Sequence, residues 1–196
     1  MDLGDIDPDP ITQFKRWLDD ATASLPEPSA MVLATADASG RPSARHVLLK
    51  GIDERGFVWF TNYESAKARD LRANPRAALV FPWFPIRRQV IVSGSVTTVD
   101  EAESDDYFAT RDRRSQISAW ASPQSEVIAD REWLVRRVVE LEARFEGADV
   151  PRPPFWGGYR LTPDRIDLWY NQPDRLHDRF RYERTEDGWE ISRLAP

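Results

Sequence analysis

The stretch RLHDRF, residues 175–180, gathers side chains that could bind an anionic ligand. In an extended strand alternate side chains share a face, so Arg175, His177 and Arg179 would point the same way. The core-facing side of a strand normally carries apolar groups. Here it would carry two guanidinium groups and one of the two histidines of the chain. We therefore expect a negatively charged group to lie against this face.

Cationic side chains in the first half of the chain suggest a phosphate site. Arg45 and Lys50 fall on opposite faces of one apolar strand, although both lie near its ends and could instead reach water. Lys67 follows Ser65 in the first turn of an expected helix. The free N–H groups and positive dipole end of a helix N-terminus favour a phosphate there. The alternative is a capping serine beside a solvated lysine.

A third group of candidates lies near the middle of the chain. Tyr107 and Arg111 are four residues apart on an expected helix and are therefore neighbours on its surface. Ser115 follows and could cap the next short helix. A phenol, a guanidinium fork and a hydroxyl together suit a phosphate dianion. The run RDRR, residues 111–114, could equally be a solvated basic turn. Gln124 and Ser125 could be only turn residues, and Trp169 could be only a core residue at a strand end.

Composition restricts the class of protein. The chain has 196 residues, 41% of them hydrophobic, which is enough for one sizeable core. Its net charge of -6 argues against general binding to nucleic acid or a membrane surface. The absence of cysteine excludes disulfides and thiolate metal sites, and two histidines supply few metal ligands. The N-terminus is acidic and proline-rich, without a signal-like apolar segment, so we expect a soluble cytoplasmic protein with no metal.

The elements that must position these residues are mainly strands. Periodicity, turn residues and caps predict an α+β fold of antiparallel strands with inserted helices, built on a small barrel. The turns DASG and DERG divide residues 30–62 into three strands of a meander. Asp100 with Glu103 resembles a capping box, and one face of a later helix carries Leu134, Val138, Leu141 and Phe145. The expected helices cover 11–24, 65–74, 100–110, 115–122 and 130–147, and the later strands cover 76–83, 87–99, 157–171 and a hairpin over 179–194.

Several of these segments, taken together, resemble one family. The segments are residues 45–67, 74–83, 87–94, 107–125, 155–161 and 175–196, and the most specific are the Trp-Gly-Gly motif at 156–158 and RLHDR at 175–179. They closely resemble the pyridoxamine 5'-phosphate oxidase family from about Ala30 to Pro196. The resemblance implies a mainly antiparallel FMN-binding split β-barrel of Greek-key type with inserted helices. Residues 1–29 would form an N-terminal arm and helix, and 30–196 a single domain ending in a dimerisation and substrate segment.

The resemblance also implies roles for individual residues in a homodimer that holds FMN at its interface. Gln124 and Ser125 could come from the partner subunit. The pair Arg175 and His177 would cover the substrate ring above the flavin as the catalytic residues. The substrate 5'-phosphate would contact Lys50, Tyr107, Arg111 and Ser115. The FMN site would comprise Arg45, Lys50, Phe60, Thr61, Ser65, Lys67, Gln89, Gln124, Ser125, Trp169 and Arg179.

The implied activity is oxidation of pyridoxamine or pyridoxine 5'-phosphate to pyridoxal 5'-phosphate, with dioxygen reduced to hydrogen peroxide. Two alternatives remain open: an FMN oxidase of the same fold acting on another ring, as in phenazine assembly, and a non-catalytic carrier of FMN or pyridoxal phosphate. The chain departs from the family pattern at three places. Ala66 stands where an arginine is common, Phe60 where a tyrosine is frequent, and WYNQPDR, residues 169–175, replaces a Trp-Gln-Gly-Gly opening.

Overall fold

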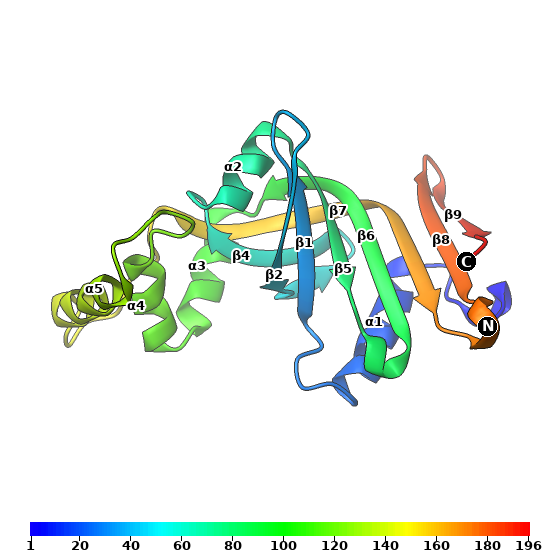
Figure 1. Cartoon of the computed structure of the whole chain (residues 1–196), viewed down its shortest axis with the longest axis horizontal. Helices are drawn as coiled ribbons and strands as arrows, with labels where there is room; N and C mark the ends of the chain where they lie inside the picture. Colours follow the sequence, from blue (N-terminus) through cyan, green and yellow to red (C-terminus); the bar gives the residue numbers. More distant parts are fainter.

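The computed structural model describes residues 1–196 and contains nine strands and five α-helices (Figure 1). The helices are α1 (Pro10–Thr22), α2 (Ala66–Ala73), α3 (Glu101–Thr110), α4 (Arg113–Ala121) and α5 (Arg131–Arg144). The strands are β1 (Ala30–Ala36), β2 (Pro42–Leu48), β3 (Gly51–Asp53), β4 (Gly56–Asn62), β5 (Arg76–Phe81), β6 (Arg88–Thr98), β7 (Trp156–Tyr170), β8 (Asp178–Thr185) and β9 (Gly188–Arg193). None of the helices has the length and apolar character needed to cross a bilayer.

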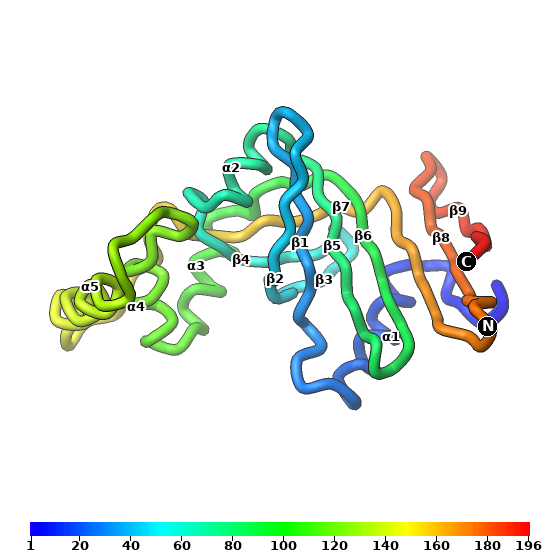
Figure 2. Tube along the Cα trace, in the orientation of Figure 1, coloured from blue at the N-terminus to red at the C-terminus, as the bar shows by residue number.

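All strands belong to one antiparallel sheet. Its main path runs β2-β1-β5-β6-β7-β4-β3, and β8 and β9 continue from β7. The two ends of the path, β2 and β3, are consecutive in the chain and are linked only by Leu49 and Lys50. Because so short a link joins the two ends, the sheet has to curl, as the trace in Figure 2 shows. The expected α+β fold with a curled antiparallel sheet is confirmed.

Both turns expected in residues 30–62 are confirmed, since β1 pairs with β2 and β3 pairs with β4, but the continuous three-stranded meander is wrong. The segment forms four strands, and β4 pairs with β7 and β3 instead of β2. The chain changes neighbours at the link: the Leu49 amide donates to the Ser29 carbonyl at 2.9 Å, and the Lys50 amide donates to the Val58 carbonyl at 2.8 Å. Strand periodicity indicates which face is buried but not which strand lies alongside. The crossing places Lys50 where the two ends of the sheet approach each other.

The expectation that 175–180 is one strand is also wrong. Strand β8 begins only at Asp178, and Pro173–Arg175 form a short 3-10 turn. Proline has no N–H to join a ladder, and the Leu176 amide instead donates to the Pro173 carbonyl at 3.1 Å. Arg175 and His177 therefore precede the strand and do not share a strand face with Arg179.

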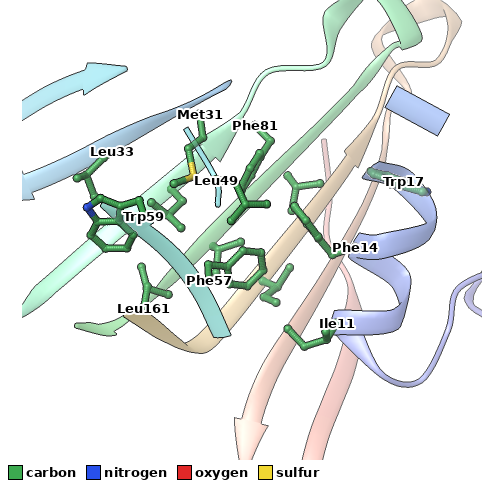
Figure 3. Close-up of a cluster of buried hydrophobic side chains, with 14 of the residues drawn as sticks. Ile11, Phe14, Trp17, Met31, Leu33, Leu49, Phe57, Trp59, Phe81 and Leu161 are labelled. Atoms are coloured by element: carbon green, nitrogen blue, oxygen red, sulfur yellow. The ribbon is translucent and has the colours of Figure 1, made fainter. Parts of the chain in front are cut away.

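The main hydrophobic core lies between the curled sheet and α1 (Figure 3). Asp9 caps α1 by accepting the amides of Ile11 and Thr12, and the apolar face of the helix then turns toward the strands. Phe14 is completely buried and meets Phe57 and Phe81 edge-on, at centroid distances of 4.9 and 4.8 Å. Such a side chain stabilises the fold by about 3–5 kcal/mol relative to alanine.

A second cluster forms the helical end of the molecule. It joins Phe108 of α3, Ile117 of α4 and Leu141 of α5 to Trp156 at the start of β7. Asp100 caps α3 by accepting the Glu103 amide, but the expected capping box does not form because the Glu103 carboxylate binds Arg160 instead. Leu134, Val138, Leu141 and Phe145 all pack in this cluster, which confirms the predicted apolar face. The cluster fixes α3 and α4 beside the sheet, and these helices carry candidate binding residues.

Candidate active site

A cleft of about 650 Å³ lies where β2 and β4 meet the helical end of the molecule. Residues from β2, β4, α2, α3, α4 and the loop after α4 line it. The sequence-predicted residues among its lining are Arg45, Lys50, Phe60, Thr61, Lys67, Tyr107, Arg111, Gln124 and Ser125. The fold thus brings together side chains that are up to 80 positions apart in the chain, counting from Arg45 to Ser125.

Lys67 lies in the lining of the cleft, almost fully buried and without a carboxylate partner. Its ammonium donates to Thr61 Oγ1 at 3.0 Å, Ser65 Oγ at 3.0 Å and Gln124 Oε1 at 2.6 Å. Burial, and to a smaller extent the nearby charge of Arg45, together lower the pKa of Lys67 to about 8. Only neutral oxygens compensate this charge, so an anion in the cleft would relieve an unfavourable desolvation.

Arg45 is held next to this ammonium by a short network. Its guanidinium donates to Thr35 Oγ1 at 2.7 Å and to the Leu33 carbonyl at 3.2 Å. Thr35 in turn donates to Asp70 of α2 at 2.6 Å, and Asp70 lies 3.7 Å from Arg45. Partial burial lowers the pKa of Arg45, opposed by Asp70. Because its side chain is fixed, Arg45 is ready to bind an anion at low conformational cost.

Arg111 is a further cation in the lining of the cleft. Its guanidinium carbon lies 4.8 Å from the Trp156 ring centre and 5.6 Å from that of Phe108. The Nη1 atom is buried and has no hydrogen-bond partner. Burial lowers the pKa of this guanidinium, yet an arginine stays charged in proteins. A buried charged donor without an acceptor is costly, and a bound phosphate or carboxylate would satisfy it.

The Trp-Gly-Gly motif shapes the wall beside Arg111. Phe60 stacks on Tyr107 at 4.0 Å and on Trp156 at 5.5 Å. A Cβ atom added at Gly158 would lie 2.8 Å from the Phe60 ring, and one at Gly157 would lie 2.2 Å from the Tyr63 hydroxyl. Both positions therefore require glycine for this close approach. Phe60 contributes a flat ring here and no hydroxyl.

Three other predicted residues lie around the cleft. Ser65 precedes α2 and is fully buried, but its hydroxyl donates to the Asn62 carbonyl and contacts Lys67 without capping the helix. Gln124 and Ser125, which were open to assignment to a partner, contact Lys67 and the Ala66 amide of their own chain. Ser115 does not line the cleft and caps nothing. The charged carboxylate of Asp112 takes the capping position of α4 and accepts the Ser115 amide.

The remaining predicted residues form a separate cluster on β6, β7 and β8. Gln89 lies opposite Trp169 in one ladder, and Trp169 lies opposite Arg179 in the next. The Trp169 ring packs against His177, with a centroid distance of 4.7 Å. Arg179 donates to the Ala195 carbonyl at 3.2 Å. Arg175 is exposed at the tip of the adjoining turn. None of these residues lines the cleft.

The two groups lie toward opposite ends of one chain. In Figure 1, α3 and α4 are at the left, whereas β8, β9 and both termini are at the right. One chain therefore holds two separate groups of the predicted residues: those that line the cleft, and the Gln89–Arg179 cluster with the turn that carries Arg175 and His177.

Comparison with known proteins identifies the family of the chain. Residues 18–145 match the model of the pyridoxamine 5'-phosphate oxidase family, and residues 156–196 match the pyridoxine 5'-phosphate oxidase C-terminal dimerisation region. The chain belongs to the pyridoxamine 5'-phosphate oxidase family. A pyridoxine/pyridoxamine 5'-phosphate oxidase of Rubrobacter xylanophilus is 60% identical over 97% of this chain and 88% of that protein. A pyridoxine/pyridoxamine 5'-phosphate oxidase of Cupriavidus taiwanensis is 57% identical over 98% of this chain and 91% of that protein.

Solved structures of family members share the whole architecture. PhzG from Burkholderia lata, solved in complex with tetrahydrophenazine-1-carboxylic acid, superposes with a TM-score of 0.92 at 38% identity, covering 97% of this chain and 94% of that one. An FMN-binding protein of Nostoc punctiforme shares the fold, with a TM-score of 0.75 at 18% identity over 95% and 97% of the chains. FMN is the cofactor of the family, and the cleft fits its phosphate because Lys67 lacks any carboxylate partner.

Sequence reasoning missed residues that support the predicted ones. Thr35 and Asp70 fix Arg45. In the sequence, Thr35 stands out only as a polar residue in an apolar strand, and Asp70 only as an acidic residue in a basic helix. Asp178 was missed although it lies within RLHDRF. It alternates with Arg179 and so falls on the side of β8 that buries Phe180 and Tyr182, where a carboxylate is unusual.

Proposed function

We propose that the protein oxidises pyridoxamine 5'-phosphate or pyridoxine 5'-phosphate to pyridoxal 5'-phosphate. The alcohol loses two electrons and two protons, and dioxygen takes them up as hydrogen peroxide. The amine reacts in the same way and also consumes one water and releases ammonia. Bound FMN supplies the redox chemistry, because a flavin accepts a hydride and returns two electrons to dioxygen. The protein residues bind, orient and shield the reactants.

The observation that carries this proposal is a single cleft whose lining contains two separate cationic groups, one of Lys67 and Arg45 and one of Arg111. The buried Nη1 of Arg111 has no hydrogen-bond partner. A phosphorylated cofactor and a phosphorylated substrate together need two anion sites that flank a flat space. The aromatic stack of Phe60, Tyr107 and Trp156 borders that space. A substrate without any anionic group would leave Arg111 uncompensated.

The second group of predicted residues would complete the cleft from a partner subunit. The matched dimerisation region, residues 156–196, contains Trp169, Arg175, His177 and Arg179. In a two-fold dimer each cleft receives the same segment of the other chain, so two equal sites form. Arg175 and His177 would then cover the substrate ring. The backbone amide of Gln172 donates to His177 Nδ1 at 3.1 Å, which leaves the Nε2 proton of the neutral ring free to donate to the substrate.

Substrate orientation follows from the same arrangement. Arg111 can hold two phosphate oxygens with its fork, and Lys50 adds a mobile charge at the edge of the cleft. Fixing the phosphate at one end and the ring under Arg175 at the other holds the reacting carbon at a constant position. Such orientation is worth several orders of magnitude in rate. Ser115 lies one turn before Ser118 of the cleft lining and would reach the phosphate only after a side-chain adjustment.

A phenazine-type oxidase is the second candidate, favoured by the close superposition of PhzG. Such a ring substrate carries a carboxylate and no phosphate, and Arg111 could bind it. The set Lys50, Tyr107 and Arg111 in the lining of the cleft favours the phosphate ester. A non-catalytic carrier would have no need for Arg175 and His177 beside the flavin.

The direct test is oxidation by the purified protein. Flavin released on denaturation should be FMN, and FAD would count against the phosphate cradle. Pyridoxamine or pyridoxine 5'-phosphate should give pyridoxal 5'-phosphate and an equal amount of peroxide. Pyridoxine without phosphate and a dihydrophenazine carboxylic acid serve as comparison substrates. Faster turnover of the phenazine acid would support the second candidate, and FMN binding without any turnover would support a carrier.

A further inference from the structure

The segment from Asn171 to His177, called here the 171–177 loop, has a strained backbone. Asp174 and Arg175 both adopt the left-handed region, with φ of 56° and 61°. Residues other than glycine rarely adopt it, and two in succession persist only if the surrounding structure holds them. The loop is mostly exposed, so packing contributes little. Hydrogen bonds must therefore keep its shape.

The strongest of these bonds converge on Asp178, which is 8% exposed. Its Oδ2 accepts from Gln172 Nε2 at 2.8 Å, and its Oδ1 accepts from Arg193 Nη1 of β9 at 2.7 Å. The amino group of Met1 also contacts Oδ2, at 3.1 Å. One carboxylate oxygen is thus tied to the sheet through Arg193, and the other reaches back to the start of the loop. Charge-assisted bonds of this kind are stronger and more directional than neutral ones.

Gln172 transmits this constraint to His177. Its side chain is fixed by Asp178, and its backbone amide donates to His177 Nδ1 at 3.1 Å. This bond requires a lone pair on Nδ1, so the proton of the neutral ring lies on Nε2. Trp169 limits the ring from one side. If Gln172 moves, both the tautomer and the orientation of His177 lose their support.

We propose that Asp178 is a positioning residue that acts through Gln172 to fix the tautomer of His177 and the placement of Arg175. Its effect on the reaction rests on the function proposed above. Gln172 lies in the segment that replaces a Trp-Gln-Gly-Gly opening. A glycine there would have no side chain to reach Asp178, so this constraint belongs to chains with a residue such as Gln172.

Kinetics of two alanine variants test the proposal. Asp178→Ala and Gln172→Ala, assayed at saturating FMN, should each lower kcat by about tenfold to a hundredfold, because a misplaced catalytic group raises the barrier. KM should change much less, since the substrate phosphate binds in the cleft. If Asp178 acts through Gln172, the double variant should be no slower than Asp178→Ala alone. The matched control is Asp167→Ala, which removes a carboxylate of the same 8% exposure paired with Arg181 of β8.

Histidine NMR gives a readout that does not depend on turnover. The chain has only His46 and His177, so ¹⁵N-histidine labelling yields two rings, and His46 on β2 serves as the internal reference. At a pH where the rings are neutral, His177 should show a non-protonated Nδ1 and a protonated Nε2. Gln172→Ala should shift both nitrogens toward the average of the two tautomers, whereas Asp167→Ala should leave them unchanged.

The outcomes separate this inference from the proposed function. Wild-type kcat in both alanine variants, or an unchanged His177 tautomer in Gln172→Ala, would overturn the positioning role. If Asp178→Ala fails to fold, the Gln172→Ala variant tests the positioning role on its own, because that substitution leaves the pair of Asp178 and Arg193 intact. A wild-type protein that oxidises none of the substrates would instead contradict the proposed function, and the tautomer measurement would still decide whether the constraint exists.

Discussion

The affinity for FMN should depend on pH through Lys67. In the protein without FMN, the pKa of Lys67 is about 8 in place of 10.5, with burial as the first cause and Arg45 as the second. That difference corresponds to roughly 3 kcal/mol for keeping the ammonium charged in the cleft. A phosphate dianion beside it favours the charged form and raises the pKa again. Binding of FMN above pH 8 should therefore be accompanied by proton uptake.

The direction and size of the pH dependence of FMN affinity follow from the change in the Lys67 pKa on binding. Below pH 8, Lys67 is already charged in the free protein and the affinity should be constant. Above pH 8, each pH unit should weaken binding by up to about tenfold until the pKa of the complex is reached. Titrating the FMN-free protein from pH 7 to 9.5 with flavin fluorescence keeps the phosphate predominantly dianionic throughout. Calorimetry in buffers of different ionisation enthalpy measures the proton uptake directly.

A matched variant isolates the residue. Lys67→Arg keeps a charge that does not titrate in this range, so its affinity should be nearly flat above pH 8. The groups that face the Lys67 ammonium are Arg45 from β2, Thr61 from β4, Ser65 and Gln124. None of these four side chains changes its charge between pH 7 and 9.5. A flat profile in the wild type, or the same slope in Lys67→Arg, would refute the reasoning.

Three further predictions concern single residues. Arg111→Ala should raise the KM for pyridoxamine 5'-phosphate by roughly ten- to a hundredfold while FMN stays bound, since a charge-assisted bond is worth about 1.5–3 kcal/mol; loss of flavin with normal substrate binding would show that the two phosphate sites are wrongly divided. Ala66→Arg, placed in the cleft lining at the start of α2, should slow FMN release about tenfold in a dilution assay, and an unchanged release rate would mean that residue 66 does not face the phosphate. The pKa of Asp178 is lowered to about 2, chiefly by the Gln172 hydrogen bond and then by Arg193, so the stability that its charge contributes is present above pH 4 and is lost as pH falls toward 2. In urea unfolding, the free energies of unfolding of wild type and Asp178→Asn should differ at pH 6 and converge toward pH 2. A difference that stays constant with pH would contradict this.

Sequence alone predicted most of the elements and half of the residues that line the cleft, for identifiable reasons. Caps such as Asp100 and apolar faces such as that of α5 depend on local chemistry, which periodicity reveals. Ladder partners depend on the whole sheet, and the meander failed because β4 pairs with β7, a strand about a hundred residues later, as in the pairing of Asn62 with Trp156. Local context also misplaced Ser115, because Asp112 is a better cap.

The 171–177 loop could not be predicted because the alternating side-chain pattern of a strand was extended over residues 175–180, which include the end of the Pro173–Arg175 turn. The left-handed backbone at Asp174 and Arg175 lies next to Gln172, whose side chain binds Asp178, and Asp178 in turn binds Arg193. Those bonds join the loop to a later hairpin, and nothing in the local residue pattern indicates them. The division of the predicted residues between two ends of one chain likewise needed three-dimensional placement.

The most direct test of a site built from two chains mixes two impaired variants, assayed at a pyridoxamine 5'-phosphate concentration far below the KM of Arg111→Ala. Arg111→Ala damages the cleft of its own chain, and Arg175→Ala damages the segment that we propose each chain lends to its partner. A mixed dimer then has one doubly altered site and one intact site. After subunit exchange at equal concentrations, peroxide release from pyridoxamine 5'-phosphate should recover to about a quarter of the wild-type activity. No recovery, despite mixed dimers detected by native mass spectrometry, would contradict a site assembled from two chains.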